Sequence, residues 1–328
     1  MAVFLLDGGI FVGRFERQKF GKSKSFSWWK NNYKRGNVSE REYKEKIHKI
    51  FSNDLHHLEY KMELIADIDE VIVCYDGIFG RRPRGKYYPD YKRHKSGIKA
   101  TKHKGIDIRE LIGDCGYNPM EIKENWKGLY IIDKEGDDLI AENLEILIKQ
   151  DKEVVIISED RDFLQCLSWS PKVRIYNLKF EIDEDWVEYK YGLTSKMYVD
   201  WKCLVGDKSD NIPGLPNVGE VKATQLLKQY GVVENLPPEV TQYYRLNDMG
   251  IQEVLKQYRV ENGLSMTACK KKYGKHWESL ENGTSKTLIP THIIMKFQET
   301  IPHVKQYFEM VDYASNLKIW KKIVKLPL

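Results

Sequence analysis

Acidic residues follow short apolar runs through the first two thirds of the sequence. Single aspartates follow two of these runs, and other runs lead into tight acidic groups with the sequences EGDD, EDRD and GDKSD. The set comprises Asp7, Asp76, Glu135, Asp137, Asp138, Asp160, Asp162, Asp207 and Asp210. Any one of them could be a helix cap or a solvated surface charge, and Asp138 is a candidate N-cap of the helix that follows it. Their repeated position favours a shared acidic pocket.

The chemistry of such a pocket is metal chemistry. Many like charges in one place raise one another's pKa values unless cations neutralise them. Mg²⁺ and Mn²⁺ prefer oxygen ligands and bridge to phosphate, and a cluster without Cys or His favours these ions over zinc. Two such ions about 4 Å apart activate water and stabilise the leaving oxygen of a phosphodiester. The acids therefore predict a two-metal centre for phosphodiester hydrolysis.

The elements that must position these acids are predicted from apolar patterning. Four runs rich in Val and Ile precede the first acids, at Val3–Leu6, Val71–Tyr75, Leu129–Ile132 and Val154–Ile157. Short continuous apolar runs are typical of parallel strands that are buried on both faces. Helical spacing between the runs, as in Asn53–Ile65, predicts helices that cover the sheet. The prediction is an α/β fold with its site at the carboxyl ends of the strands.

A basic segment with interleaved tyrosines follows Asp76. Ten Lys and Arg residues lie between Arg81 and Lys104, and Tyr87, Tyr88 and Tyr91 stand among them. The segment could be a solvated charge run. Because it follows Asp76 directly, however, it emerges over the acidic pocket, where a phosphate backbone would neutralise it and bases could stack on the rings. The candidate contacts are Arg81, Arg82, Arg84, Lys86, Tyr91, Lys92, Arg93 and Lys95.

A turn rich in Pro and Gly follows the last acids. Helical periodicity stops over Asn211–Gly219 and resumes over Val221–Gln229. Such turns between helices are often purely structural. Backbone amides at a helix start also bind phosphate, and the candidate residues here are Gly214, Val218, Gly219 and Lys222.

Composition limits the class of protein. The 328 residues carry 53 Lys and Arg against 48 Asp and Glu, a net charge of +5, and 41% of them are hydrophobic. This length suits about two domains with a real core. We find no apolar run of membrane-spanning length and no signal peptide at the start. Five scattered cysteines fit reduced thiols. We therefore expect a cytoplasmic protein, in the host cytoplasm if the source is a phage.

Six motifs, in order, resemble the 5′-nuclease family, which includes phage 5′–3′ exonucleases, flap endonucleases and the nuclease domain of bacterial DNA polymerase I. The matching stretches are LLDGG at Leu5–Gly9, CYDG at Cys74–Gly77, RGKYYPDYKRHK at Arg84–Lys95, EGDDLIAE at Glu135–Glu142, ISEDRDFLQ at Ile157–Gln165 and GDKSDNIPGLPNVGEVKATQLL at Gly206–Leu227. They cover residues 1 to about 231. Gly9 departs from the pattern because relatives often have Asn at this position.

The resemblance implies roles for these residues. Asp7, Asp76, Glu135, Asp137 and Asp138 would surround a first Mg²⁺, and Asp160, Asp162, Asp207 and Asp210 a second. Arg84, Tyr91 and Lys92 match the Arg and Tyr-Lys motif of an arch, here about residues 78–105, with Lys92 and Arg84 steadying the scissile phosphate. A helix-hairpin region over residues 186–235 would hold duplex DNA, with K⁺ as a possible ligand of its loop.

The implied protein is a 5′–3′ exonuclease or flap endonuclease with a PIN-like core over residues 1–185. Its substrate would be DNA with a 5′ single-strand/duplex junction, or an RNA–DNA primer, during phage-type replication. It would act as a monomer, with a polymerase or single-strand-binding protein as a possible partner. Residues 236–328 are expected to be mostly helical, with a polar insertion over Glu261–Thr287.

Two other classes stay open. A PIN-like ribonuclease would share the acidic pocket and the parallel sheet, but it has no need of the hairpin motif or the basic arch. A non-catalytic junction-binding protein on the same fold would have lost metal ligands, whereas the set from Asp7 to Asp210 is intact. Preference for RNA, or binding without cleavage, would favour these classes.

Overall fold

A computed structural model describes residues 1–10, 26–93, 108–246, 251–273, 276–282, 288–299, 301 and 308–327. Within these residues the chain forms two compact units. The first unit contains Met1–Val199, Lys208–Ile212 and Lys322–Leu328, and the second contains Asp200–Asp207 and Pro213–Lys321. The chain therefore returns twice to the first unit, which the sequence pattern alone does not indicate. The division at residues 185 and 235 stays a prediction.

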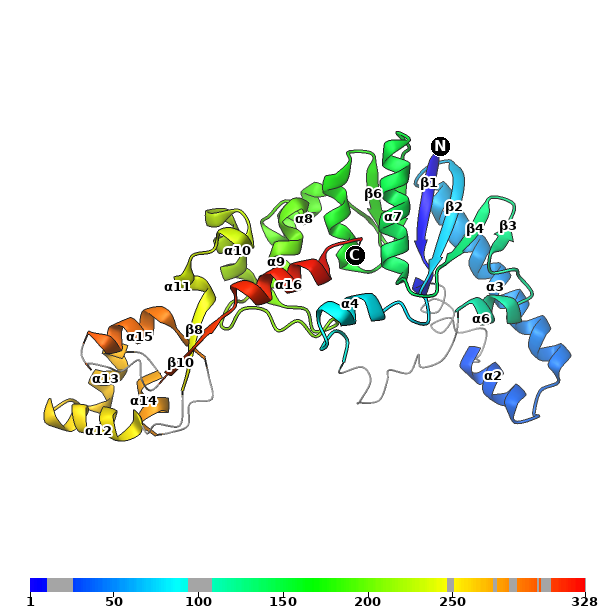
Figure 1. Ribbon diagram of the computed structural model, residues 1–328. Coiled ribbons are helices and arrows are strands. Elements are labelled where there is room, and N and C mark those ends of the chain that lie inside the picture. The colour runs from blue at the N-terminus through cyan, green and yellow to red at the C-terminus, as the bar shows by residue number, and fades with distance from the viewer. Residues whose placement is uncertain are drawn as a thin grey trace. The chain divides into compact units, whose positions relative to one another are not determined.

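A mixed sheet forms the centre of the first unit, with the strand order β3-β4-β2-β1-β5-β6-β7. Five strands are parallel, namely β1 (Ala2–Asp7), β2 (Ile68–Tyr75), β4 (Trp126–Tyr130), β5 (Val154–Ile157) and β6 (Val173–Tyr176). The short edge strands β3 (Glu121–Lys123) and β7 (Glu181–Ile182) run antiparallel to their neighbours. The expected α/β fold is confirmed (Figure 1).

Alternation along β1 shows that both faces of the sheet are covered. Ala2, Phe4 and Leu6 belong to one hydrophobic cluster, whereas Val3 and Leu5 are buried on the opposite face. Helix α3 (Glu40–Glu63) covers the first face, and α7 (Gly136–Lys149) lies on the other side of the sheet (Figure 1). The expected helix at Asn53–Ile65 is thus the second half of a longer helix.

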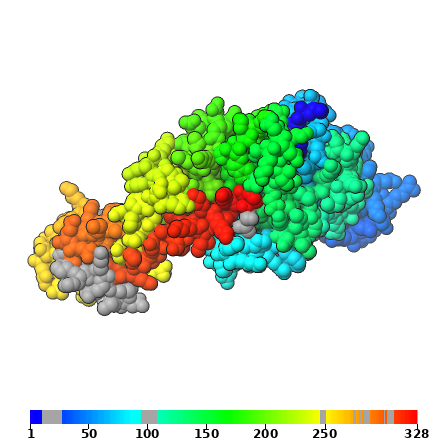
Figure 2. Space-filling view, turned by 45° about the horizontal axis from the view of Figure 1, so that its top comes forward, coloured from blue at the N-terminus to red at the C-terminus, as the bar shows by residue number. Residues whose placement is uncertain are grey.

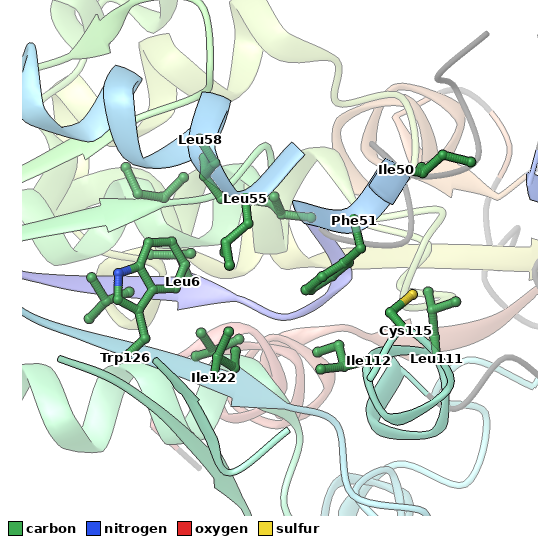
Figure 3. Close-up of a cluster of buried hydrophobic side chains, with 14 of the residues drawn as sticks. Leu6, Ile50, Phe51, Leu55, Leu58, Leu111, Ile112, Cys115, Ile122 and Trp126 are labelled. Atoms are coloured by element: carbon green, nitrogen blue, oxygen red, sulfur yellow. The ribbon is translucent and has the colours of Figure 1, made fainter. Parts of the chain in front are cut away.

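The cluster under α3 joins several elements of the first unit. Phe51 and Leu55 of α3 point toward the sheet, where Trp126 is fully buried (Figure 3). Helix α6 (Ile108–Asp114) contributes Leu111 and Ile112 to the same cluster. Ser39 caps the start of α3 because its hydroxyl accepts a hydrogen bond from Glu42 N at 3.2 Å. This packing fixes β1 and β2, whose ends carry the first two acids.

Shorter elements complete the first unit. They are α2 (Phe26–Lys34), α4 (Arg82–Tyr87), the 3₁₀ helix η1 (Arg161–Trp169), α8 (Glu184–Tyr191) and η2 (Ser195–Met197). Helix α8 begins after Asp183, whose carboxylate accepts a hydrogen bond from Trp186 N at 2.8 Å, and ends at Gly192 with φ +68°. The next helix, α9 (Tyr198–Val205), leads into the second unit.

The second unit is mostly helical, with a small antiparallel sheet of its own in the strand order β10-β8-β9. Its elements after α9 are α10 (Glu220–Tyr230), η3 (Val233–Asn235), α11 (Pro238–Thr241), β8 (Gln242–Leu246), α12 (Ile251–Glu261), α13 (Met266–Tyr273), α14 (His276–Glu281), β9 (Ile289–Pro290), α15 (Thr291–Gln298), β10 (Phe308–Asp312) and most of α16 (Ala314–Val324). The helices on either side of the Pro-Gly turn agree with the sequence pattern.

The expected polar insertion contains more structure than its composition suggests. Helices α13 and α14 lie within it, and Tyr273 and Trp277 stack at 4.7 Å in a buried cluster with Phe297. Strand β10 lies where the pattern suggested a helix. Pairing with β8 explains this difference, because a partner distant in sequence decides the strand. No helix in the described parts of the chain has both the length and the apolar character needed to cross a membrane.

Candidate metal centre

The carboxyl ends of neighbouring strands position the acids of the first unit. Asp7 is the last residue of β1, and Asp76 directly follows β2. The EGDD group begins α7, so that Glu135 is at the N-cap position and Asp138, the expected cap, lies within the first turn. Asp160 is the cap of η1 after β5 and accepts a hydrogen bond from Asp162 N at 2.9 Å. Parallel register puts these strand ends at one edge of the sheet.

Two hydrogen bonds hold the carboxylate of Asp7 at this edge. Its Oδ1 accepts a hydrogen bond from Gly9 N at 2.8 Å, and its Oδ2 accepts one from the Ser158 hydroxyl at 3.0 Å. Burial and the charges of Asp76 and Asp160 nevertheless raise the pKa of Asp7 to about 6. The favourable hydrogen bonds are therefore too weak to offset burial and repulsion.

The pKa of Asp137 is raised by burial and by neighbouring charges, as for Asp7, and the shift is large. Burial raises its pKa well above the ordinary value, and the charges of Asp7, Asp160 and Asp76 add to the effect. Lys92 acts in the opposite direction but does not compensate. These four aspartates thus form a group with an excess of negative charge, which is the electrostatic condition for binding a divalent cation.

Close backbone packing brings Asp76 into this group. The N–H of Gly136 donates to Asp76 Oδ1 at 2.7 Å. A Cβ at Gly136 would lie 3.2 Å from the same oxygen and from Cys74 O, so a side chain there would crowd the contact. The glycine of the EGDD group therefore lets the start of α7 approach the end of β2.

The other two acids of the EGDD group are neutralised within the protein. Arg84 Nη1 and Nη2 donate to the two carboxylate oxygens of Asp138 at 2.5 and 2.7 Å, and Nη1 also donates to Glu135 Oε2 at 2.9 Å. Glu135 accepts further bonds from Tyr91 Oη and Lys92 Nζ, both at 2.6 Å. Although burial opposes it, the combined effect of these partners lowers the pKa of Glu135.

Arg84 and Lys92 differ in accessibility. The Arg84 side chain is 3% exposed, and its Nε donates to Ile323 O at 3.0 Å. The Lys92 side chain is 15% exposed, with Nζ 3.7 Å from Asp210 Oδ1. Burial disfavours the Lys92 charge, but Glu135 and Asp210 outweigh it and raise the pKa of Lys92. Both side chains are therefore cations beside the acids.

A pocket of about 90 Å³ lies among these groups, lined by Arg84, Tyr91, Lys92, Asp137, Asp160, Asp162, Ser209, Asp210, Ile323, Val324 and Leu326. Asp162 and Asp210 bring carboxylate oxygens within 4.8 Å of each other. Asp207 belongs to the second unit, where Lys202 Nζ lies 2.5 Å from its Oδ2. Its role as a metal ligand stays a prediction.

The remaining predicted contacts in the basic segment are mostly on the surface. Arg81, Arg82, Lys86 and Arg93 are exposed. Arg82 lies over the Phe79 ring at 3.6 Å, and Arg93 bonds to Asp90 at 3.0 Å. The predicted contact Lys95 lies outside the described residues.

The turn before α10 has a definite local structure in the second unit. Gly214 has φ +71°, and a Cβ there would lie 2.6 Å from backbone atoms of Val205 and Gly206. Val218 is buried, Gly219 is the N-cap residue of α10, and Lys222 is exposed in its first turn. Only glycine suits the backbone at position 214. Nucleic-acid contacts of this turn stay a prediction.

Sequence reasoning missed two polar residues of the centre. Ser158 follows β5 directly, and its hydroxyl bonds to Asp7 and accepts a hydrogen bond from Asp160 N at 3.0 Å. The rule that found the acids, a polar residue after a buried strand, could have found it. Gln165 is 4% exposed and contacts residues more than 150 positions away. No local pattern indicates such contacts.

Two family models match consecutive parts of the chain. Residues 56–192 match the N-terminal resolvase-like domain of 5′–3′ exonucleases, and residues 193–286 match their C-terminal SAM fold. The fold and the acidic edge thus define the class, a resolvase-like α/β domain followed by a SAM-like helical domain. The chain belongs to the 5′–3′ exonuclease family.

Named relatives are similar over part of the chain. DNA polymerase I of Bacillus caldotenax is 39% identical over 131 residues, which are 38% of this chain and 14% of that protein. Flap endonuclease Xni of Aeromonas salmonicida is 30% identical over 167 residues, which are 51% of this chain and 59% of that protein. The chain thus spans less than two thirds of the length of these relatives.

A solved structure of the bacteriophage T5 flap endonuclease, in complex with DNA and metal ions, is also similar. It is 14% identical, with a TM-score of 0.49, and the match covers 98% of this chain and 100% of that one.

Removing one charge from the acidic group should stabilise the metal-free protein. The raised pKa of Asp137 means that its charged form destabilises the fold, and this loss grows as the pH rises above the ordinary aspartate range. We expect Asp137→Asn to raise the melting temperature in EDTA at pH 8 by roughly 2–4 °C, or about 1 kcal/mol, with a smaller gain at pH 5.

Thermal unfolding of both proteins at the two pH values tests this expectation. Asp67→Asn is the matched control, because Asp67 is exposed just before the amino-terminal end of β2, away from the acids. An equal or lower melting temperature for Asp137→Asn at pH 8 would contradict the proposed repulsion.

Proposed function

We propose that the protein is a divalent-metal-dependent 5′ nuclease that hydrolyses phosphodiester bonds in DNA near a 5′ single-strand/duplex junction. The observation that carries the proposal is the gathering of Asp7, Asp76, Asp137 and Asp160 at one edge of the sheet, where burial and repulsion raise the pKa values of Asp7 and Asp137. Membership of the 5′–3′ exonuclease family supports the reaction class. As an exonuclease, a flap endonuclease or both, the protein would release fragments from a 5′ end.

The donor set fits hard divalent ions. Four aspartates meet at this edge of the sheet, and burial and mutual repulsion raise the pKa values of Asp7 and Asp137. A bound divalent cation would offset this repulsion. Asp7, Asp76, Asp137 and Asp160 would hold one Mg²⁺, and Asp162 and Asp210 would hold a second. The role of Asp207 stays a prediction. Mn²⁺ would substitute. Such ions lower the pKa of water and neutralise charge on the phosphate. Glu135 and Asp138 would not coordinate the ion directly, because their carboxylate oxygens already accept hydrogen bonds from Arg84, Tyr91 and Lys92. K⁺ at the Pro-Gly turn stays a prediction.

Lys92 is the cation best placed to meet the substrate. It lines the acidic pocket, and its ammonium lies between Glu135 and Asp210. Its backbone has φ +49°, a conformation that is uncommon outside glycine and asparagine and here places the side chain at the acids. A phosphate would draw Nζ from the carboxylates as charge develops on the phosphate oxygens. Arg84 would orient Glu135 and Asp138 in this arrangement.

The exposed cations suit a polyanionic substrate. Arg81, Arg82 and Lys86 follow Asp76 on the surface, and Lys222 lies at the start of α10. Phosphate contacts of this kind are independent of sequence, so affinity should fall steeply with salt. A single strand would bind near the basic segment, and the Pro-Gly turn would hold duplex. RNA in RNA–DNA primers is a second possible substrate.

Cleavage of a labelled flap tests the function directly. A 5′-labelled flap duplex, with blunt and single-stranded controls, is incubated with the protein in Mg²⁺ or in EDTA. We expect Mg²⁺-dependent release of 5′ fragments, and Asp160→Asn should lower the rate by at least about 100-fold because it removes a metal ligand. Asp67→Asn should cleave normally.

The products separate the alternatives. Short, stepwise fragments would indicate exonuclease action, and one long fragment would indicate flap cleavage. Preference for RNA would favour a PIN-like ribonuclease. Tight binding without cleavage in Mg²⁺ and Mn²⁺ would contradict the nuclease proposal and leave a junction-binding protein.

Metal binding should also be visible without substrate. Mg²⁺ binds only the folded acids and should therefore raise the melting temperature, by the equivalent of about 2.7 kcal/mol at 100 times its Kd. The gain should be larger at pH 8 than at pH 5, because protons on Asp7 and Asp137 compete with the ion. A melting temperature independent of Mg²⁺ at pH 8 would contradict a metal centre.

Replacing Lys92 should affect the chemical step more than binding. We expect Lys92→Ala to lower kcat by about 10²–10³-fold, because a preorganised cation is lost from the developing charge. Affinity for the flap, measured in Ca²⁺, should change little. Lys86→Ala is the matched contrast, because Lys86 is exposed on α4 and should weaken binding in low salt while kcat is retained. The reverse pattern would assign phosphate stabilisation to another residue.

A further inference from the structure

One wall of the acidic pocket comes from the far end of the described chain. Ile323, Val324 and Leu326 line the pocket together with Asp137, Asp160, Asp162 and Asp210. All three apolar residues are almost completely buried. They belong to the first unit, although more than 100 residues of the second unit precede them. Figure 2 shows this end of the chain, in red, beside the cyan region that contains α4.

A single side chain holds the backbone of this wall. Gln165 is buried in η1, and its Nε2 donates to Val324 O at 3.1 Å while its Oε1 accepts a hydrogen bond from Leu326 N at 2.9 Å. The same Nε2 also donates to Asp162 O at 2.8 Å. One amide thus connects the wall with the start of η1, which carries Asp162 directly after the cap residue Asp160.

Further contacts fix the segment on its other sides. Arg84 Nε donates to Ile323 O at 3.0 Å, and Lys322 Nζ lies 3.3 Å from the centre of the Tyr87 ring. One residue earlier, within the second unit, Lys321 bonds to Asp200 and Glu234 at 2.9 and 2.8 Å. The guanidinium that orients Asp138 and Glu135 is therefore also held by the wall.

We propose that Ile323–Leu326 is the apolar wall of the catalytic pocket and that Gln165 is the positioning residue that seats it. This proposal rests on the proposed nuclease function. The wall excludes water from Arg84 and its carboxylates, which strengthens their interaction and keeps the start of α7 in place. Gln165 touches neither substrate nor reacting atoms, and it acts through the backbone of the segment and of Asp162.

Gln165→Met tests the role because it keeps the length of the side chain but removes its hydrogen bonds. We expect kcat on the flap to fall by about 10–100-fold, as for other outer positions of metal sites, with KM within about twofold of the wild type. Gln150→Met is the matched control, since Gln150 is exposed at the end of α7. Each variant counts as folded if its melting temperature lies above the temperature of the assay.

A double-mutant cycle shows whether Gln165 acts through the wall. Val324→Ala trims the wall in the full chain, and adding Gln165→Met to it should lower kcat by less than the product of the two single losses. Multiplied losses would overturn the proposal, as would an unchanged kcat for Gln165→Met or a loss restored by assaying at a lower temperature. If the wild type itself does not cleave in Mg²⁺ or Mn²⁺, the nuclease function fails instead.

Discussion

Repulsion among carboxylates at one edge of a parallel sheet is the constraint on which the rest of the first unit depends. Asp7, Asp76, Asp137 and Asp160 lie where strands β1, β2 and β5 and helix α7 meet, and burial raises the pKa of both Asp7 and Asp137. A fold that keeps such a group must obtain the necessary free energy elsewhere. The packed cluster between α3 and the sheet, in which Trp126 is fully buried, contributes to it.

The acids of the first unit fall into two groups, those that repel one another at the edge of the sheet and those that are paired with the guanidinium of Arg84. Arg84 makes a paired contact with Asp138 and a further bond to Glu135, so these two charges are matched in the folded protein. Removing one member of this buried group would leave the opposite charge without a partner, which would destabilise the fold. A planar guanidinium suits this role because it bonds two carboxylates at once, whereas the ammonium of Lys92 keeps one carboxylate partner at close range and stays partly exposed.

Local patterns predicted the fold and most of the acidic site, and long-range contacts explain what they missed. The run at Val154–Ile157 is a strand with the expected bounds, because a buried parallel strand needs continuous apolar residues. The buried position of Arg84 was not predicted, because sequence shows its charge but not its partners at positions 135, 138 and 323. Strand β10 and the role of Gln165 likewise depend on residues far away in the chain.

The distant contacts arise because two later segments of the chain return to the first unit. Residues 208–212 bring Asp210 to the pocket, and residues 322–326 bring its apolar wall, on either side of the excursion through the second unit. A core that ended at Val199 would keep the strands and the acids of β1, β2 and β5 but would lack both of these parts. A chain without either segment would therefore have an incomplete pocket, and the second unit is covalently connected to both segments.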